Sequence, residues 1–269
     1  MLARIRTALV LLPITLLVIW MPWLRLGFVF FISALVSVGM WEYFVLVRRR
    51  AIEPEVTGAA VVVLALIFTA HWGSLRHLNL VLTLGFLFVT MCHLFFRWHT
   101  IGGMAAALFG VLYLGWLPAH FVMLRDITPA GPGLLTLLLG AVALSDSGAM
   151  YIGSRYGRHK LAPKTSPNKS WEGAFAGLAG GVAAGFICIG LRELFNCAGF
   201  PDRSAAWYAV TGAVLALTGQ VGDLVESMLK RDAGVKDSGT IFPGHGGVLD
   251  RCDGYLFAGP VLYYWLTFV

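Results

Sequence analysis

Charged side chains are scarce in this sequence. Asp, Glu, Lys and Arg make up 13% of its 269 residues, whereas hydrophobic residues make up 58% and the mean hydropathy is +0.77. Soluble globular domains carry about 25% charged residues. The shortage excludes an ordinary soluble globule and indicates a polytopic membrane protein.

Cysteine is also sparse, and the four cysteines show no paired spacing. We therefore expect neither a disulfide framework nor a cysteine-based zinc site. The sequence also lacks internal repeats, low-complexity segments and a linker. We accordingly expect a single membrane domain over 1–269, in which 1–125 is mainly scaffold and 132–269 is the catalytic half.

Apolar runs long enough to cross a bilayer, which needs about 20 residues per helix, recur along the whole chain. They predict an all-α, polytopic integral membrane protein. We expect about nine transmembrane helices, at roughly 8–24, 26–47, 56–72, 78–96, 104–124, 132–152, 172–191, 205–228 and 254–269.

The positive charges predict an orientation for these helices. If the N-terminus is cytoplasmic, every lysine and arginine falls on the cytoplasmic side except Arg25, Arg76, Arg125, Arg192 and Arg203. Cytoplasmic loops of membrane proteins carry such an excess of Lys and Arg. Two polar loops, 153–171 and 229–253, then face the cytoplasm, and the compact chain favours a bacterial inner membrane.

The net charge of +6 does not indicate a nucleic-acid partner. The basic residues are confined to short loops between the predicted spans. Membrane topology and anionic lipid headgroups account for them.

The most polar stretch, 219–253, lies between the apolar runs 205–218 and 255–269. Its carboxylates Asp223, Asp250 and Asp253 stand at the ends of two predicted membrane helices, where ionisable groups are costly and usually functional. If 249–255 is helical, Asp250 and Asp253 share one face, because they are three residues apart. Carboxylates suit Mg²⁺, which proteins hold with one or two of them plus substrate phosphates.

Basic residues and glycines lie between these carboxylates. Lys230, Arg231 and Lys236 can neutralise phosphate, and a glycine-rich turn at Gly246 and Gly247 lets backbone N–H groups approach it. Carboxylates for a metal beside cations for phosphate indicate phosphoryl or nucleotidyl transfer.

The same stretch resembles a known enzyme family. Residues 227–253 read SMLKR-x4-KD-x-G-x2-FP-x-HGGV-x-DR-x-D. This pattern is similar to the signature of CDP-diacylglycerol synthases, also called phosphatidate cytidylyltransferases, at more than a dozen positions.

A second segment resembles the cytoplasmic loop of that family. Residues 160–173 read KLAPK-x-SP-x-KS-x-EG. A plain positive-inside loop would also be basic, but two prolines and alternating Ser and Lys define a shape. We expect this loop to bind phosphate or a lipid headgroup.

The resemblance implies transfer of a cytidylyl group from CTP to phosphatidate, giving CDP-diacylglycerol and pyrophosphate in phospholipid biosynthesis. It implies Mg²⁺ held by Asp223, Asp250 and Asp253, and it leaves a second cation open. The expected partners are CTP, phosphatidate and membrane lipids.

The resemblance also assigns roles to individual residues. The catalytic set that it implies is Asp223, Lys230, Lys236, His245, Asp250, Arg251 and Asp253. The substrate-binding set is Asp146, Lys164, Ser166, Lys169, Ser170, Arg231, Gly246 and Gly247. Asp146 could contact the nucleotide or be a further metal ligand, and a plain helix-end carboxylate is the alternative. For Arg231 the alternative is a cation that reaches the membrane interface.

Two other functions remain open from the sequence. One is a cytidylyltransferase that acts on another phosphorylated lipid. The other is an ion-coupled membrane transporter, because carboxylates in membrane helices also mark ion paths. The polar cluster at one membrane face, with its glycines and lysines, favours the enzyme.

Two features lie outside these motifs. Gly177, Gly181 and Gly185 form a small-residue ladder, which lets helices approach closely either within the protomer or across a homodimer. Glu42, near the inner end of the second predicted span, is interpreted as an interfacial carboxylate.

Overall fold

The computed structural model describes residues 12–96, 100–241 and 246–268, and most of them are helical. This confirms the all-α class, with one small hairpin added. After a helical stretch over 12–20, the elements are η1 (Pro22–Leu24), α2 (Arg25–Arg48), α3 (Val56–Trp72), α4 (Leu75–Phe96), α5 (Ile101–Val111), the π-helical turn η2 (Leu112–Trp116), α6 (Leu117–Asp126), α7 (Gly131–Tyr156), β1 (Lys160–Ala162), β2 (Ser166–Ser170), α8 (Trp171–Phe195), α9 (Ala205–Asp232) and α10 (Leu249–Phe268).

The chain divides into two compact units. Unit 1 comprises Met1–Met123 and Leu229–Arg251, and unit 2 comprises Leu124–Met228 and Cys252–Val269. The divisions fall within α6, α9 and α10. The single domain over 1–269 stays a prediction.

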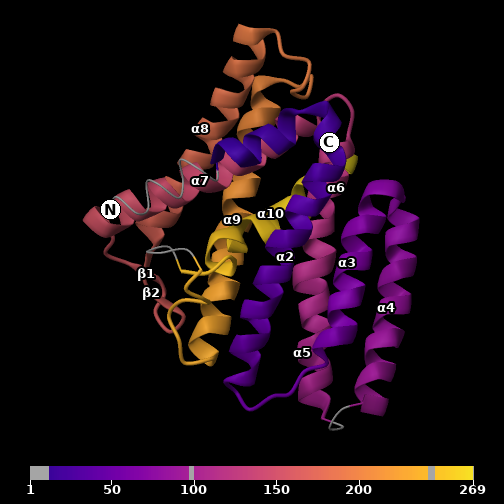
Figure 1. Cartoon of the computed structure of the whole chain (residues 1–269). Helices are drawn as coiled ribbons and strands as arrows, with labels where there is room; N and C mark the ends of the chain where they lie inside the picture. The colour runs from indigo at the N-terminus through magenta and orange to yellow at the C-terminus, as the bar shows by residue number, and fades with distance from the viewer. Residues whose placement is uncertain (1–11, 97–99, 242–245, 269) are drawn as a thin grey trace. The chain divides into compact units, whose positions relative to one another are not determined.

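In unit 1, α3 packs against both α2 and α4 (Figure 1). Gly85 on α4 faces the side chain of Val62 so closely that a Cβ at this position would collide with it. The first turn of α3 is capped by Glu55, whose carboxylate accepts a hydrogen bond of 3.1 Å from the backbone N–H of Gly58. Such caps satisfy N–H groups that have no partner within the helix.

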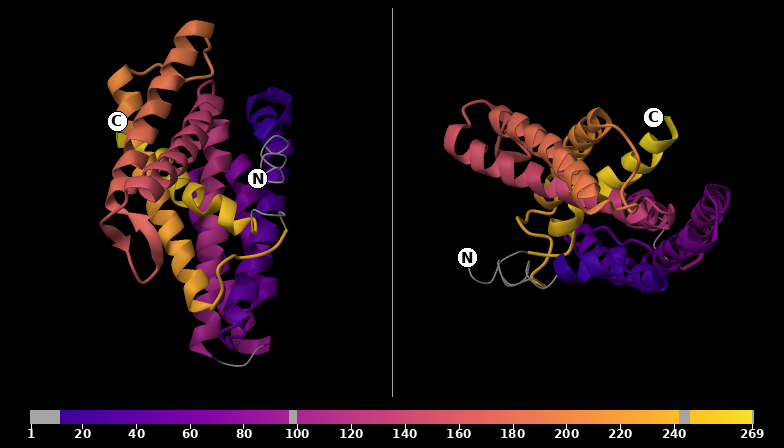
Figure 2. Two further views of the ribbon diagram at one scale, coloured as in Figure 1. Left: turned by 90° about the vertical axis from the view of Figure 1, so that its left-hand side faces the viewer. Right: turned by 90° about the horizontal axis from the view of Figure 1, so that it is seen from above.

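In unit 2, α7 and α8 run side by side (Figure 2), and the glycine ladder of α8 explains how closely its neighbours approach. Gly181 faces the backbone of Gly212 on α9, and Gly185 faces the backbone of Tyr208. Neither contact leaves room for a side chain. The ladder therefore packs within the protomer, and the homodimer stays a prediction without support from it.

The chain between α7 and α8 forms an antiparallel hairpin (Figure 2), paired Lys160 to Ser170 and Ala162 to Ser166. Ser170 ends the hairpin and caps α8, because its Oγ accepts a hydrogen bond of 3.2 Å from the N–H of Gly173. The segment predicted as the loop 153–171 is thus partly regular structure.

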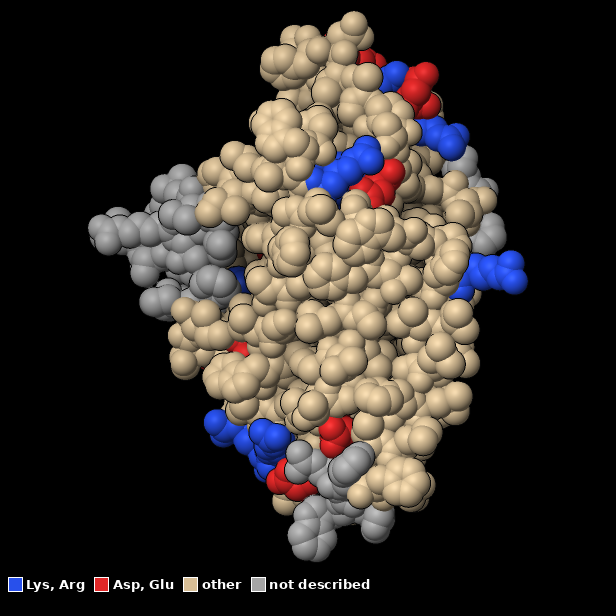
Figure 3. Space-filling model, turned by 45° about the vertical axis from the view of Figure 1, so that its right-hand side comes forward, with Lys and Arg blue, Asp and Glu red and all other residues tan. Residues whose placement is uncertain are grey.

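Six helical segments are long and apolar enough to cross a membrane among the residues described: Pro22–Arg48, Leu75–Phe95, Ile101–Asp126, Gly131–Tyr156, Trp171–Phe195 and Ala205–Asp232. Together with the composition they identify an integral membrane protein, as predicted. The face drawn in Figure 3 is mostly uncharged, as lipid-facing helices require. The count of nine spans stays a prediction.

Helices α9 and α10 extend further into the predicted loop 229–253 than expected. The helix α9 continues to Asp232, and α10 begins at Leu249. Lys230, Arg231 and Asp250 therefore lie in helical turns. Basic residues favour the last turn of a helix and acidic residues its first turn, because both complement the helix dipole.

Candidate functional site

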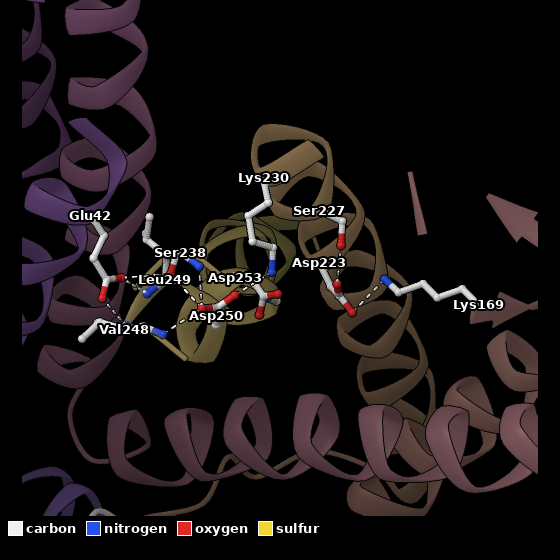
Figure 4. Close-up of polar contacts among 12 residues, drawn as sticks. Glu42, Lys169, Asp223, Ser227, Lys230, Ser238, Val248, Leu249, Asp250 and Asp253 are labelled. Atoms are coloured by element: carbon white, nitrogen blue, oxygen red, sulfur yellow. Dashed lines mark hydrogen bonds and ion pairs between the residues drawn. The ribbon is translucent and has the colours of Figure 1, made fainter. Parts of the chain in front are cut away.

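Asp250 lies in the first turn of α10, where groups of unit 1 orient its carboxylate (Figure 4). Its Oδ2 accepts hydrogen bonds of 2.8 Å from the backbone N–H of Ser238, the hydroxyl of Ser238 and the N–H of Gly247. Its Oδ1 lies 2.6 Å from Nζ of Lys230. Both oxygens of the carboxylate therefore have a defined direction.

The pair of Lys230 and Asp250 is nearly closed to solvent, with side chains that are 14% and 5% exposed. Burial by itself raises the pKa of the Asp250 carboxyl. The hydrogen bond from Lys230 and those from the backbone of Gly247 and Ser238 outweigh this, so the pKa lies below its ordinary value. Asp250 is thus ionised at neutral pH, beside a cation.

The backbone around Asp250 explains two glycines of the motif. Gly246 has φ of +77°, in the left-handed region, and a Cβ there would lie 2.5 Å from Oδ2 of Asp250. At Gly247 a Cβ would collide with both Ser238 and Glu42. The N–H of Gly247 is directed at Asp250, and a role of either glycine toward phosphate stays a prediction.

Glu42 belongs to this cluster, and the sequence reasoning missed it. The interfacial interpretation is wrong, because the residue is 1% exposed. Its carboxylate accepts hydrogen bonds from the backbone N–H groups of Val248 (3.0 Å) and Leu249 (2.9 Å) and lies 3.1 Å from the hydroxyl of Ser238 (Figure 4). The sequence did carry a signal for this residue. Glu42 is an acidic residue inside an apolar span, and ionisable residues in such spans are usually functional.

Unit 2 holds a second lysine–aspartate pair. Nζ of Lys169, on β2, lies 2.7 Å from Oδ2 of Asp223, on α9 (Figure 4). Ser227, one turn further along α9, donates a hydrogen bond of 3.2 Å to Oδ1. The structure thus joins the hairpin motif to the first carboxylate of the polar stretch 219–253.

Asp253 lies on α10 where this helix packs against α9 in unit 2. A Cβ on Gly222 would collide with the backbone oxygen of Asp253, so the two helices meet backbone to backbone beside Asp223. The carboxylate of Asp253 accepts a hydrogen bond of 2.7 Å from the N–H of Gly254. Helix α10 starts at Leu249, so the condition that 249–255 is helical, under which Asp250 and Asp253 were expected to share one face, is confirmed.

Gln220 is a second residue that the sequence reasoning missed. Its amide Nε2 donates hydrogen bonds of 3.1 Å to Oγ of Ser145 on α7 and to the carbonyl oxygen of Ala174 on α8. It lies three residues before Asp223 and therefore on the preceding turn of α9. A glutamine inside a glycine-rich apolar run carries no motif that would have revealed this link.

The chain at the start of the hairpin is also tied to α8, by a contact between His159 and Glu172. Nδ1 of His159 lies 2.7 Å from Oε1 of Glu172, in the first turn of α8. Ser170 is buried as the cap of α8, whereas Lys164 is exposed and Ser166 is partly exposed. The hairpin therefore fixes Lys169 and Ser170 and presents Lys164 to solvent.

The remaining predicted residues lie at the surface or outside the described part of the chain. Asp146 is exposed on α7, Arg231 on α9 and Arg251 on α10, and Lys236 is exposed in the segment between α9 and α10. His245 lies outside the described residues. The ion pairs seen for Asp250 and Asp223 are with Lys230 and Lys169, so the catalytic role that the resemblance implies for Arg251 stays a prediction.

The oxygen chemistry of Asp223, Asp250 and Asp253 fits a hard divalent cation. In unit 2 two of them, Asp223 and Asp253, lie on helices in backbone contact. At Asp250, Oδ2 accepts three hydrogen bonds and Oδ1 lies 2.6 Å from Nζ of Lys230, so a metal ion would have to displace one of these partners. Within the described ranges, no group of three or more His, Cys, Asp or Glu side chains is arranged to hold a metal ion. The Mg²⁺ site and a second cation stay predictions.

Comparison with known proteins extends the two motifs to the whole chain. A sequence model of the Cytidylyltransferase family matches residues 2–269. A protein of Brucella suis is 36% identical over 266 residues, 97% of this chain and 91% of the relative. A protein of Pseudomonas aeruginosa is 37% identical over 273 residues, 96% and 94% of the two chains, and one of Synechocystis sp. is 33% identical over 278 residues, 88% and 87%. All three are named phosphatidate cytidylyltransferase.

Proposed function

The chain belongs to the Cytidylyltransferase family, and from this premise we propose that it transfers a cytidylyl group from CTP to phosphatidate. The products are CDP-diacylglycerol and pyrophosphate, and the reaction serves phospholipid biosynthesis. The names of the relatives support this substrate pair. The structural observation that carries the proposal is the pair of lysine–aspartate contacts, Lys230 with Asp250 and Lys169 with Asp223, in the polar stretch 219–253 and the hairpin motif.

The reaction joins two polyanions. A phosphate oxygen of phosphatidate attacks the α-phosphorus of CTP, a new P–O bond forms, and the bond to the bridging oxygen of the departing diphosphate breaks. The attacking oxygen is already anionic, so no strong general base is needed. The main demands on the protein are to position the phosphates and to stabilise the charge that builds up on pyrophosphate.

Each of the two paired lysines, Lys230 in unit 1 and Lys169 in unit 2, has the chemistry to contribute to these demands. A lysine ammonium is a compact point charge with three donors, so it can keep one hydrogen bond to its aspartate and give another to a phosphate oxygen. The aspartates orient the two ammonium groups before substrate arrives. The exposed side chains Lys164, Arg231 and Lys236 attract the anionic substrates to the site.

Mg²⁺ is the expected cofactor, with Asp223, Asp250 and Asp253 as its protein ligands. When bound, it would neutralise the triphosphate and polarise its phosphorus–oxygen bonds. We place the site on the cytoplasmic side of a bacterial inner membrane. The excess of basic residues in the predicted cytoplasmic segments supports this orientation.

Pyrophosphate release that depends on both CTP and phosphatidate tests the proposal. It is measured for the wild type and Asp250→Asn across a Mg²⁺ titration in detergent. We expect the folded variant to lose at least about a hundredfold in kcat, the scale on which removal of a transition-state electrostatic group acts. Asp232→Asn is the matched control, because this exposed α9 carboxylate pairs with Arg50 at 3.4 Å and has no role in the proposed site.

The outcomes separate the alternatives. Near-normal activity of Asp250→Asn would place the site elsewhere. A wild type that is inert with phosphatidate but active with another phosphorylated lipid would overturn the acceptor alone. Ion flux into vesicles without turnover of CTP would favour the transporter.

A further inference from the structure

Glu42 is a carboxylate in the interior of the predicted scaffold half. It lies on α2, is 1% exposed and is flanked by well-packed neighbours. The hydroxyl of Tyr43 donates a hydrogen bond of 2.9 Å to the backbone oxygen of Ala106. One turn earlier, a Cβ on Gly39 would lie 3.2 Å from the side chain of Leu249. The position of Glu42 is therefore fixed by its own helix.

All the hydrogen bonds described above for Glu42 come from the catalytic motif. Oε1 accepts from the N–H of Val248, and Oε2 accepts from the N–H of Leu249. These N–H groups stand at the start of α10, where no preceding turn can accept them. A negative charge also complements the positive end of the helix dipole. Glu42 thus caps α10 from a residue more than 200 positions away in the chain.

Two motif glycines make room for this carboxylate. A Cβ on Gly239 would collide with Oε1 of Glu42, and a Cβ on Gly247 would collide with both of its oxygens. Both glycines lie within the segment that leads from α9 to α10. The motif is thus shaped around the Glu42 side chain as well as around Asp250.

Ser238 connects Glu42 to Asp250. Its hydroxyl lies 3.1 Å from Oε2 of Glu42 and 2.8 Å from Oδ2 of Asp250, and it can donate its single proton to one of them at a time. The neighbouring backbone N–H groups are divided between the two carboxylates. Gly247 donates to Asp250, whereas Val248 and Leu249 donate to Glu42. The two carboxylates therefore hold one short stretch of backbone from opposite directions.

From this arrangement we propose that Glu42 is a positioning residue for the reaction. It fixes the first turn of α10 and the hydroxyl of Ser238, and through them it sets the direction of the Asp250 carboxylate. This inference rests on the proposed function for its kinetic consequence, whereas its structural part concerns the unliganded chain alone.

Glu42→Gln tests the inference, because the amide is nearly the same size but has one acceptor oxygen. Its NH₂ group would face a backbone N–H, donor against donor. We expect kcat per folded enzyme to fall about 10- to 100-fold, the range for loss of a residue that orients a functional ligand. The KM for CTP should change little, because the lysines remain. Glu42→Asp keeps two acceptor oxygens and should lose less.

Glu55→Gln is the matched control. Glu55 is also a buried carboxylate of unit 1 that caps a helix, and it is 5% exposed. Its cap is on α3, away from the motif in sequence. We expect the control to keep wild-type kcat per folded enzyme, even if it unfolds at a lower temperature.

Hydrogen–deuterium exchange of the peptide 246–252 gives a readout that needs no turnover. In Glu42→Gln the amides of this peptide should exchange faster than in the wild type, whereas in Glu55→Gln they should not. Unchanged exchange in Glu42→Gln, or an equal loss of kcat in both variants, would overturn the positioning role. If the wild type makes no CDP-lipid, the proposed function fails, and the exchange comparison alone decides whether Glu42 orders the segment.

Discussion

Lys230 and Asp250 form an ion pair that solvent scarcely reaches. Removing two charges from water costs several kcal/mol per ion, and the pair is stable only because each charge faces the other and Asp250 accepts further hydrogen bonds. Loss of one partner is therefore worse than loss of both. The pair should respond to pH in a direction that its environment determines.

Lys230→Met should lower the free energy of unfolding by about 3–5 kcal/mol at neutral pH, because it leaves a buried carboxylate without its cation. In the wild type the pKa of Asp250 is lower in the folded state than in the unfolded state, where it is about 3.9. The contribution of the pair to stability is therefore fully present above the unfolded pKa and is lost as pH falls through the folded pKa. In the variant the lowering by Lys230 is lost while burial still raises the pKa, so we expect the pKa of Asp250 to lie higher than in the wild type. The difference in unfolding midpoint between the two proteins should therefore shrink as pH falls from 7 toward 4.

The double variant Lys230→Met, Asp250→Asn is the control for charge. It removes both ions and should recover much of the stability that Lys230→Met loses. Unfolding midpoints in detergent, followed by circular dichroism, measure all three variants. A deficit that stays constant from pH 7 to 4 would contradict a charge-based origin.

At this scale the sequence predicted residues better than it predicted their partners. The polar stretch 219–253 identified Lys230, Asp250 and Asp223, because ionisable side chains at the ends of apolar runs are costly and usually functional. The sequence did not predict that Lys169 pairs with Asp223. The two residues are 54 positions apart in the chain, and only the fold brings Lys169 to Asp223 on α9.

Helix α8 shows what glycine does for an element of this fold. Gly181 and Gly185 let the backbone of α8 touch that of α9, whereas Gly190 on the same helix has no atom within 4 Å of its Cβ position. Because membrane helices gain little from hydrophobic burial against each other, such close packing and the dispersion forces it brings hold them together.

Gly181→Val should destabilise unit 2 by at least about 1–3 kcal/mol, since the new side chain meets backbone that cannot rotate away. Gly190→Val, in open space, should be close to neutral. Unfolding of both variants in mixed detergent micelles measures the effect. Equal stability of the two variants would show that α8 and α9 do not depend on this contact.

Element boundaries at the site were less predictable. The sequence indicated a basic loop from 153 to 171, but the strands β1 and β2 within it have only three and five residues. Strands this short carry too little alternation to be recognised. The helical start of α10 was predicted only conditionally, because the cap described for it comes from Glu42, which is far away in the chain.

The distribution of charge concerns the whole molecule. The fold class followed from composition alone, because long apolar runs in a membrane leave few options besides helices. The number of spans did not follow, since α3 has 17 residues and α10 carries charged residues in its first turn. The orientation rests on the asymmetry of lysine and arginine.

A pair of introduced cysteines tests this orientation. Asn168→Cys lies in the hairpin and Arg203→Cys lies in the segment between α8 and α9, and both positions are exposed. In a chain whose native cysteines are replaced by serine, we expect a membrane-impermeant maleimide to label position 203 in intact spheroplasts. Position 168 should react only after the membrane is opened. The reverse pattern would invert the proposed topology.

The cap on α10 also bears on how the chain is made. Val248 follows Glu42 by 206 residues, and at about 5–20 residues per second a ribosome needs roughly 10–40 s to add them. During this interval α2 has already been synthesised and can enter the membrane. The backbone N–H groups of Val248 and Leu249, which donate to Glu42, have not yet been made. An unpaired carboxylate in hydrocarbon is costly, so we expect α2 to wait near the membrane surface. Its final depth is then reached late, when the end of the protein emerges from the ribosome.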